Sequence, residues 1–260
     1  MSTPCRPGEF RHYTQFGAYH WIGIHPARWW QSDPFNHARY DLPLAIIGRN
    51  LNLAGSLGLD IGCGDGVMLH KITARGGIAV GLDLDRLALQ FATERCRQLH
   101  HVSPLLIDGS CYEMPIADEA VDFVVAIQLM QHLETPADFL REAARVLKPS
   151  GVLCLTTPNR AGFLNAPAPK DGFRVYYLAH ELRELLSPYF REIEIIGQNP
   201  RALVQLWRGV TRVGVLNGLV KMGFRALSTV GLNPFVLMTA AQPSKASATL
   251  VAICRTQPRA

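Results

Sequence analysis

The stretch LDIGCGDG, residues 59–66, places three glycines and two acids directly after a short apolar run. Glycine lets a ligand approach the backbone closely, because it has no Cβ and accepts left-handed dihedral angles. Compared with the dinucleotide fingerprint G-x-G-x-x-G, Gly66 comes one residue early and Val67 takes the place of the third glycine. Asp65 lies where a pyrophosphate would sit, and its carboxylate repels phosphate and attracts an ammonium group. We therefore expect a cationic ligand without phosphate rather than a nicotinamide dinucleotide.

The elements that position this loop are short apolar runs alternating with helical stretches. Runs that are apolar almost throughout are typical of strands buried on both faces of a parallel sheet. This alternation predicts an α/β, Rossmann-like doubly wound fold, with a mostly parallel seven-stranded sheet and helices on both faces. Ligands of such sheets bind at the carboxyl ends of the strands. The predicted strands are residues 57–61, 78–83, 104–108, 121–127, 151–157, 191–197 and 248–255, and the predicted helices are residues 41–53, 66–75, 85–99, 136–147 and 179–189.

Several motifs in chain order resemble one known family. The stretch Asp60–Gly66 looks like the first motif of the class I methyltransferases, which use S-adenosylmethionine. The resemblance extends over about residues 55–198 and, weakly, over the final predicted strand. The further matching segments are Gly81–Asp85, Asp108-Gly109, Asp122–Val125, Gln128–Leu133 and Arg145–Leu153.

The resemblance implies S-adenosylmethionine as the cofactor and S-adenosylhomocysteine as the product. In the family, the acid at the position of Asp83 holds both ribose hydroxyls, and two carboxylate oxygens facing two adjacent hydroxyls suit that task. The family holds the adenine amino group at the position of Asp108. By this resemblance, the cofactor-binding residues are Asp60, Gly62, Cys63, Gly64, Asp65, Asp83, Leu84, Asp108, Gly109 and Gln128.

Three residues are candidates for catalysis. Methyl transfer from a sulfonium is an in-line displacement that depends on positioning and desolvation, so a base helps only where the acceptor must lose a proton. His132 follows the fourth predicted strand and is interpreted either as that base or as a structural residue of its loop. Tyr19 and His20 lie in the N-terminal region that commonly forms a lid in the family. The alternative is that they only pack this lid onto the core.

The chain divides into three predicted parts. Residues 1–53 form an aromatic-rich N-terminal lid that is irregular up to about residue 40. Residues 54–198 and 247–260 form the Rossmann-like domain. Residues 199–246 form a basic, helical insertion before the last strand, because they are too many for a hairpin turn.

The insertion gives the best indication of the acceptor. All 21 acidic residues lie at or before Glu194, whereas eight of the 26 basic residues follow it. A helix over residues 201–213 gathers its basic residues on one face and its apolar residues on the opposite face. A second segment repeats the pattern, with Lys221 and Arg225 four residues apart and an apolar face of Leu216, Leu219, Met222 and Phe224. Such helices suit either peripheral contact with an anionic membrane through residues 201–227 or a cap over the active site. The basic face is formed by Arg201, Gln205, Arg208 and Arg212, and the apolar face by Leu203, Leu206, Trp207, Val210 and Val213.

Composition limits the remaining classes. The six cysteines form no CxxC pair and are expected to be reduced thiols of a cytoplasmic protein. The histidines near the N-terminus fit no standard metal pattern, so we expect no metal. The first 13 residues carry no secretory signal, and no uncharged apolar run reaches the roughly 20 residues of a spanning helix. No RNA-binding module is recognisable, so nucleic acid is not an expected partner.

These observations predict methyl transfer from S-adenosylmethionine to a small-molecule acceptor with an apolar or lipid-like part. We expect methylation of oxygen, a choice that depends on the candidate histidine base. One alternative is C- or N-methylation of a polar natural product or a sugar. A second is a non-catalytic, cofactor-binding protein that associates with a membrane or a partner. A nicotinamide oxidoreductase is a third, which the displaced third glycine disfavours.

Overall fold

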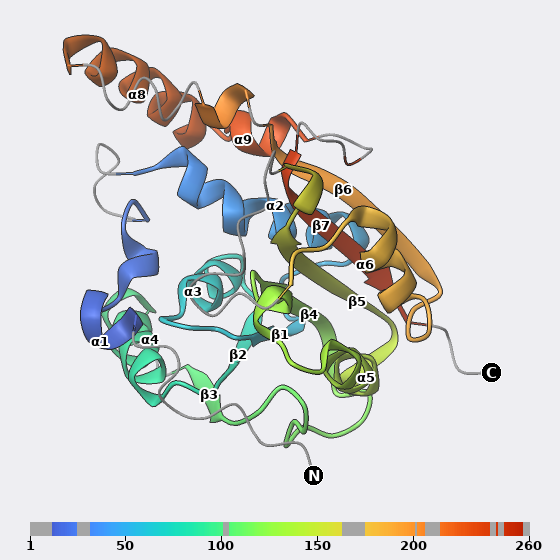
Figure 1. Cartoon of the computed structure of the whole chain (residues 1–260). Coiled ribbons are helices and arrows are strands. Elements are labelled where there is room, and N and C mark those ends of the chain that lie inside the picture. The colour runs from blue at the N-terminus through green and yellow to red at the C-terminus, as the bar shows by residue number, and fades with distance from the viewer. Residues whose placement is uncertain are drawn as a thin grey trace.

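A seven-stranded sheet forms the centre of the protein, with the strand order β3-β2-β1-β4-β5-β7-β6 (Figure 1). The computed structural model describes residues 12–24, 32–100, 104–162, 175–200, 202–205, 214–239, 243 and 247–256. The strands are β1 Leu57–Ile61, β2 Ile78–Asp83, β3 Leu105–Asp108, β4 Val121–Ile127, β5 Leu147–Pro158, β6 Glu192–Pro200 and β7 Ser247–Arg255.

The sheet is parallel from β3 to β5, and β7 pairs antiparallel with both β5 and β6. The strand order reverses between β1 and β4, which is the switch point where ligands of doubly wound sheets bind. The predicted α/β, mostly parallel, seven-stranded fold is therefore confirmed. β6 continues to Pro200, so the sheet extends two residues into the segment predicted as an insertion.

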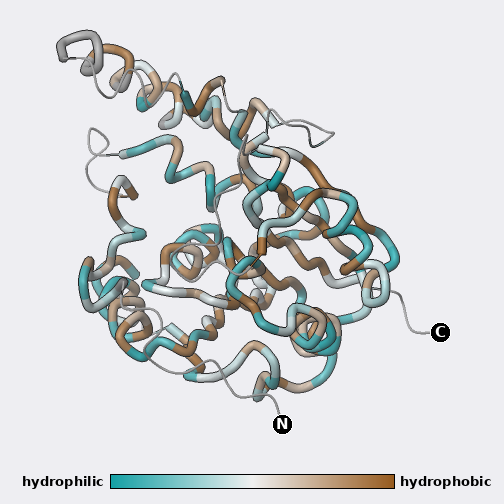
Figure 2. Tube along the Cα trace, viewed as in Figure 1, coloured by the Kyte–Doolittle hydropathy of each residue, from teal (hydrophilic) through white to brown (hydrophobic). Residues whose placement is uncertain are grey.

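Helices cover both faces of the sheet, as predicted. On β4, Val124 and Ala126 belong to a core cluster with α5 and α6, whereas Phe123 and Val125 belong to one with α2, α3 and α4. Alternate residues of a strand point to opposite faces, so each face buries its own apolar layer. Figure 2 shows hydrophobic residues concentrated along these strands. The helices are α2 Pro34–Asn50, α3 Val67–Thr73, α4 Arg86–His100, α5 Pro136–Val146 and α6 Ala179–Leu186.

The helix α2 differs from its prediction, because it begins at Pro34 and not near residue 41. The Asp33 side chain accepts a hydrogen bond from the Phe35 N–H at 2.9 Å, which caps the helix, and Pro34 occupies its first turn. Residues up to about 40 are therefore not all irregular. Pro43 lies inside the helix, where proline usually interrupts. Burial of Leu42, Leu44, Ile46 and Ile47 stabilises the helix across this position.

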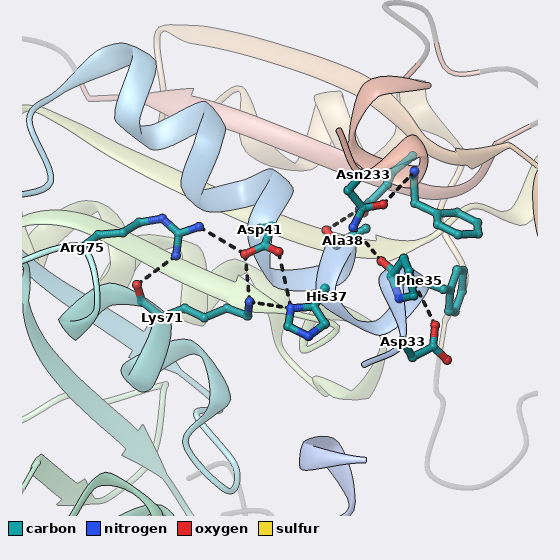
Figure 3. A network of polar contacts seen from close by, with 11 residues as sticks. Asp33, Phe35, His37, Ala38, Asp41, Lys71, Arg75 and Asn233 are labelled. Carbon is teal, nitrogen blue, oxygen red and sulfur yellow. Dashed lines mark hydrogen bonds and ion pairs between the residues drawn. The ribbon is translucent and has the colours of Figure 1, made fainter. Parts of the chain in front are cut away.

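Polar contacts bind α2 to its neighbours on both sides (Figure 3). Toward α3, the Asp41 carboxylate lies 2.9 Å from Lys71 Nζ and 3.2 Å from Arg75 Nη2. Although burial raises the pKa of Asp41, hydrogen bonds and charge from His37 and Lys71 outweigh it and hold that pKa well below its ordinary value. Lys71 Nζ also lies 3.1 Å from His37 Nδ1, so the helix is fixed by a network and not by a single pair.

The opposite side of α2 is held by the segment before the last strand. The Asn233 amide donates to the Pro34 carbonyl at 2.8 Å, and the Gln198 amide donates to the Ala38 carbonyl at 2.8 Å. Phe35 packs edge-on against Phe235, with ring centroids 5.3 Å apart. These contacts place α2 above the carboxyl end of β6 and the amino end of β7, which are paired in the antiparallel register.

The remaining elements lie at the two ends of the chain. Before α2, α1 (His12–Phe16) and the short 3-10 helix η1 (Tyr19–Trp21) lie against α4 and the glycine loop. Two further 3-10 turns, η3 (Met130–His132) and η4 (Arg160–Gly162), follow β4 and β5. In the insertion, α8 (Gly214–Thr229) and α9 (Pro234–Leu237) pack beside α2, and Figure 1 shows α8 extending away from the sheet. None of the helices in the described ranges is long and apolar enough to span a bilayer.

The predicted basic helix over residues 201–213 falls mostly outside the described residues, as do the side chains of Arg201, Arg208 and Arg212. Within the described part, Val204 is buried and packs with Ala38 and Phe235. The faces of α8 differ from the prediction, because Phe224 packs inward and Arg225 donates to the Ser32 carbonyl at 2.6 Å. Leu219 and Met222, predicted to share the apolar face of Phe224, are exposed.

Candidate active site

The glycine loop between β1 and α3 adopts a backbone that requires glycine. Gly62, Gly64 and Gly66 have φ angles of 70°, 54° and 86°, in the left-handed region. A Cβ on Gly64 would lie 2.2 Å from the Tyr13 hydroxyl oxygen. A Cβ on Gly66 would lie 2.9 Å from the Ala92 Cβ of α4. The glycines thus allow both the turn and the close approach of α1 and α4.

Asp83 is fixed beside this loop at the end of β2. Its carboxylate accepts hydrogen bonds from the Gly64 N–H at 2.8 Å and from the Asp85 N–H at 2.9 Å. Burial raises the pKa of Asp83, while these backbone donors oppose the rise. A carboxylate held by two backbone groups has a defined direction, which a ribose-binding acid needs.

Asp108 lies directly across from Asp83, since the parallel register of β2 and β3 pairs the two residues. The predicted adenine-binding acid therefore stands beside the predicted ribose-binding acid. Arg86, which sequence reasoning missed, lies with its Nε 2.5 Å from Asp108 Oδ2. Both side chains are substantially exposed, and Leu84 is exposed beside them. Gly109 lies next to these residues, because its N–H donates to the Asp83 carbonyl at 3.1 Å.

Asp60 and Cys63 lie beneath the loop and not on its open side. Asp60 is buried in β1, and burial together with the charge of Asp83 raises its pKa well above the ordinary value. Cys63 is buried against Gly81, where a Cβ would lie 2.8 Å from its Sγ. Both side chains shape the loop from below, so direct contact between either side chain and the cofactor stays a prediction.

The N-terminal segment covers the glycine loop through Asp65, whose side chain is almost completely buried. The carboxylate accepts a hydrogen bond from the His20 N–H at 3.0 Å, and His20 Nδ1 lies 3.2 Å from its other oxygen. The Trp21 indole N–H donates to the Asp65 carbonyl at 2.7 Å. Asp65 was predicted to attract an ammonium group. In the structure, this carboxylate holds the lid.

Tyr13 completes this contact and was not found from the sequence. Its hydroxyl lies 3.1 Å from His20 Nδ1, and its ring lies 5.2 Å from that of Tyr19. Burial and the nearby Asp65 charge raise the pKa of Tyr13. Tyr19 stacks on His20, with ring centroids 4.0 Å apart. The catalytic candidates Tyr19 and His20 thus lie over the glycine loop, on the expected cofactor side.

A separate cavity of about 290 Å³ lies on the other side of the switch point, under α2 and the ends of β4 to β7. Its polar wall includes Thr156, Asn199 and Thr249, and its apolar wall includes Phe35 and Val204. Gln128 borders the cavity directly after β4, and β4 pairs with β1, which ends at the glycine loop. The two regions therefore meet at Gln128. Val204 was not on the predicted apolar face of the insertion, and Gln205, predicted on its basic face, also lines the cavity.

Gln128 has a left-handed φ of 55°, and its N–H donates to the Thr156 carbonyl at 3.0 Å. The buried Gln131 amide donates to the Gln128 carbonyl at 2.6 Å and lies 3.2 Å from His132 Nε2. His132 is therefore linked to the loop at the junction of the two regions. It is not one of the side chains that line the cavity.

Asn199 was also missed, although Asn before proline is a turn signal. Its φ is 59°, and the structure thereby turns β6 at the cavity wall. Within the described part of the chain, no three side chains of histidine, cysteine, aspartate or glutamate gather as metal ligands. Of the predicted cofactor residues, the geometry brings together Gly62, Gly64, Asp83, Asp108 and Gly109, whereas the carboxylate of Asp65 is engaged by the lid.

Residues 59–155 match a protein-family model described as a methyltransferase domain. A ubiquinone biosynthesis O-methyltransferase of Methylococcus capsulatus is 30% identical over 151 residues, covering 54% of this chain and 60% of that protein. A probable S-adenosylmethionine-dependent methyltransferase of Mycolicibacterium smegmatis is 34% identical over 143 residues, covering 54% of each protein. The chain thus matches a little over half the length of these relatives.

Solved structures share the fold across nearly the whole chain. A putative sarcosine dimethylglycine methyltransferase from Galdieria sulphuraria has a TM-score of 0.67 at 18% identity, covering 96% of this chain and 98% of the other. Phosphoethanolamine N-methyltransferase 2 of Haemonchus contortus, in complex with phosphomonomethylethanolamine and S-adenosylhomocysteine, has a TM-score of 0.65 at 17% identity, covering 95% of this chain and 58% of the other. At such identities the likeness concerns the fold.

Proposed function

We propose, from its membership of the class I S-adenosylmethionine-dependent methyltransferases, that this chain methylates a small molecule held in the cavity under α2. The observation that carries the proposal is the position of Asp83. Its carboxylate is fixed by the Gly64 and Asp85 N–H groups, across from Asp108 and beside three left-handed glycines. This is the donor and acceptor set that a nucleoside requires.

The residues present fit this cofactor. The two Asp83 oxygens suit a pair of ribose hydroxyls, Asp108 suits an amino group, and the glycine loop lets a ligand approach its backbone. The loop has no third glycine at the dinucleotide position, where Val67 begins α3. When bound, S-adenosylmethionine supplies a methyl group already activated by the sulfonium charge.

The protein contributes mainly positioning and exclusion of water. Gln128 separates the cofactor region from the cavity, and its own backbone is fixed by Thr156 and Gln131. The lid residues His20 and Trp21 close over Asp65. We assign His132 a positioning role, because its Nε2 lies in hydrogen-bond range of the Gln131 amide that holds this loop.

We propose oxygen as the methylated atom and an apolar part in the acceptor. The support for oxygen is the similarity to ubiquinone biosynthesis O-methyltransferases from several bacteria at 28–32% identity. The support for an apolar part is the Phe35 and Val204 wall. The N-methyltransferase neighbour shares only the fold and does not decide the atom.

A second proposal concerns the surface. Large apolar side chains are exposed on and after α8, and the chain after Glu194 carries no acid. An apolar, positively charged surface favours peripheral contact with an anionic membrane. The exposed side chains are Leu219, Met222, Leu227, Val230, Leu232, Leu237 and Met238.

Methyl-labelled S-adenosylmethionine tests the proposed function. The full chain is incubated with an extract of its source cells, and aqueous and organic-soluble label are separated. Label in the organic phase that is lost with Asp83→Ala supports methylation of an acceptor with an apolar part. Label only in the aqueous phase contradicts that part of the proposal. Cofactor binding without any transfer contradicts the enzymatic function and favours a binding protein.

A further inference from the structure

Among the described residues that line the cavity under α2, Arg39 is the one charged side chain. The other described side chains that line it are amides, hydroxyls and apolar groups. None of them is a histidine, a carboxylate, a lysine, a tyrosine or a cysteine, so this lining offers no general base that works near neutral pH. If a proton must leave the acceptor, the described lining of the cavity has no group to take it. An acceptor that must lose a proton therefore has to ionise before it binds.

Arg39 is half-buried on α2 and faces the cavity without a carboxylate partner. Among the described residues, no acidic group lies in ion-pair range of its guanidinium. Asp41, two residues along the same helix, is already engaged by Lys71, Arg75 and His37. The neighbouring Tyr40 phenol hydrogen-bonds with the Arg39 side chain, but burial raises the pKa of Tyr40, so Tyr40 stays neutral and does not compensate the Arg39 charge.

The turn of α2 that carries Arg39 is held in place by contacts on both sides of the helix. The preceding residue, Ala38, accepts a hydrogen bond from Gln198 at 2.8 Å, and Pro34 accepts one from Asn233 at 2.8 Å. The Asp41 network holds the next turn of the helix. A cation without an anionic partner, on a rigid element in a partly desolvated cavity, favours a ligand with negative charge.

Asn199 provides a second, independent observation in the same cavity. Its side chain is 8% exposed, and its Oδ1 has no hydrogen-bond partner among the described residues. Its Nδ2 donates to Thr249 Oγ1 at 3.4 Å, which leaves the oxygen as the unsatisfied atom. A buried acceptor without a partner is unfavourable, and a ligand donor relieves this.

We infer that the acceptor binds in this cavity as an anion, with its negative charge at Arg39 and a neutral hydroxyl or N–H group donating to Asn199 Oδ1. The charge is carried by a carboxylate or by an ionised hydroxyl. This inference rests on the proposed function for the identity of the cavity as the acceptor site. It adds to the proposed function that the acceptor is an anion. An acceptor oxygen that is already ionised needs no protein base.

The transfer balances without a proton acceptor in the cavity lining. Where the anion is the reacting oxygen, that oxygen forms the new bond to the methyl carbon. The carbon–sulfur bond breaks and its electron pair stays on sulfur. A cation and an anion become two neutral groups, and the proton has left the acceptor before binding. Where the charge is a carboxylate elsewhere on the molecule, Arg39 orients the acceptor instead.

Small aromatic probes test the anion site without requiring methyl transfer. We would titrate benzoate, benzamide and the three hydroxybenzoate isomers into the full chain by calorimetry, with and without S-adenosylhomocysteine. Benzamide matches benzoate in shape but is neutral. The isomers place a hydroxyl at three distances from the carboxylate and so report on Asn199. A nitrophenol, titrated below and above its ionisation, distinguishes an ionised hydroxyl from a carboxylate.

The expected result is that the wild type binds benzoate at least about tenfold more tightly than benzamide, since hydrogen bonds to charged groups contribute at least about 1.5 kcal/mol. Arg39→Gln removes this preference, and Arg39→Lys keeps part of it. Equal binding of benzoate and benzamide, or failure of every anionic probe to bind, would overturn the inference. So would an Arg39→Gln variant that keeps the preference.

Asn199 supplies variants that retain the backbone. Asp and Gly both tolerate the left-handed φ of 59° at this position. Asn199→Asp adds a negative charge and is expected to weaken benzoate binding at least about tenfold. Asn199→Gly is expected to remove the advantage of the best hydroxybenzoate isomer over benzoate. Unchanged binding in both variants would contradict the role of Asn199.

Asp83→Ala separates this inference from the proposed function. This variant is expected to lose S-adenosylmethionine binding while it keeps the preference for benzoate. A protein that binds the anions but transfers no methyl group contradicts the proposed function and keeps the anion site. A protein that transfers methyl groups but shows no preference for anions contradicts the anion site alone.

Discussion

Replacing Asp41 by asparagine tests whether the network in Figure 3 holds α2 over the cavity. The Asp41 carboxylate is the partner of Lys71 Nζ at 2.9 Å, and the Lys71 side chain is 8% exposed. Burial lowers the pKa of Lys71, and Asp41 opposes that shift, so loss of the carboxylate leaves a buried ammonium unpaired. Breaking a buried pair costs about 3–5 kcal/mol. The Asp41 side chain is 25% exposed, which lets solvent screen the charge, so we expect a loss of about 2–3 kcal/mol.

The assay is urea unfolding at neutral pH, with Glu192→Gln as the matched control. Glu192 pairs with Arg255 at 2.6 Å, but the two side chains are 62% and 46% exposed. Exposed pairs contribute little, so this control should stay within about 0.5 kcal/mol of the wild type. Removing both partners, with Asp41→Leu and Lys71→Met together, should recover most of the lost stability.

The stability difference between wild type and Asp41→Asn should depend on pH. The folded-state pKa of Asp41 lies below its ordinary value of about 3.9. The stability that the Asp41 carboxylate contributes is therefore complete above that ordinary value and is lost as the pH falls through the folded-state pKa. The difference in unfolding free energy between wild type and Asp41→Asn should therefore be full at neutral pH and shrink below about pH 4. An Asp41→Asn variant as stable as the Glu192→Gln control would refute the reasoning.

The remaining predictions concern the loop, the histidine and the surface. Gly66→Ala should lower stability by about 1–2 kcal/mol in urea unfolding and weaken cofactor binding, because φ is 86° and the Ala92 Cβ is 2.9 Å from the added group; equal stability contradicts this. His132→Gln should lower kcat and leave the shape of the pH–rate profile unchanged, whereas loss of its acidic limb would show that His132 is a base. The full chain should co-sediment with phosphatidylglycerol vesicles less as salt rises, and Leu219→Ser with Met222→Ser should weaken this more than Leu105→Ser does; no binding at low salt contradicts membrane contact.

The sheet could be predicted because its strands carry a local signal. β1, β2 and β4 match their predicted bounds, since apolar runs between turn residues mark a buried parallel strand wherever they occur. The start of α2 could not be predicted with the same rule. Residues 34–40 lack the apolar run found in residues 41–53, and their Phe35 and Ala38 pack against Val204 and Phe235, which are distant in sequence.

The grouping of residues around the glycine loop was predicted better than the cavity for a similar reason. Gly62 directly follows β1, and Asp83 and Asp108 end β2 and β3, so the strand order alone brings them together. Arg39 and Asn199 meet only because α2 packs above β6, an arrangement fixed by contacts such as Gln198 to Ala38 across 160 residues. The role of Asp65 also depends on tertiary structure, because its carboxylate is taken by a lid from the N-terminal segment.

The central claim is that the loop and Asp83 bind S-adenosylmethionine, and calorimetric titration of the cofactor tests it most directly. Wild type should bind, and Asp83→Ala should bind at least about a hundredfold more weakly, because two hydrogen bonds to a charged acceptor are lost. Asp138→Asn, on the surface of α5, serves as the control and should bind like the wild type. Unchanged affinity in folded Asp83→Ala, or no binding by the wild type, would contradict the account.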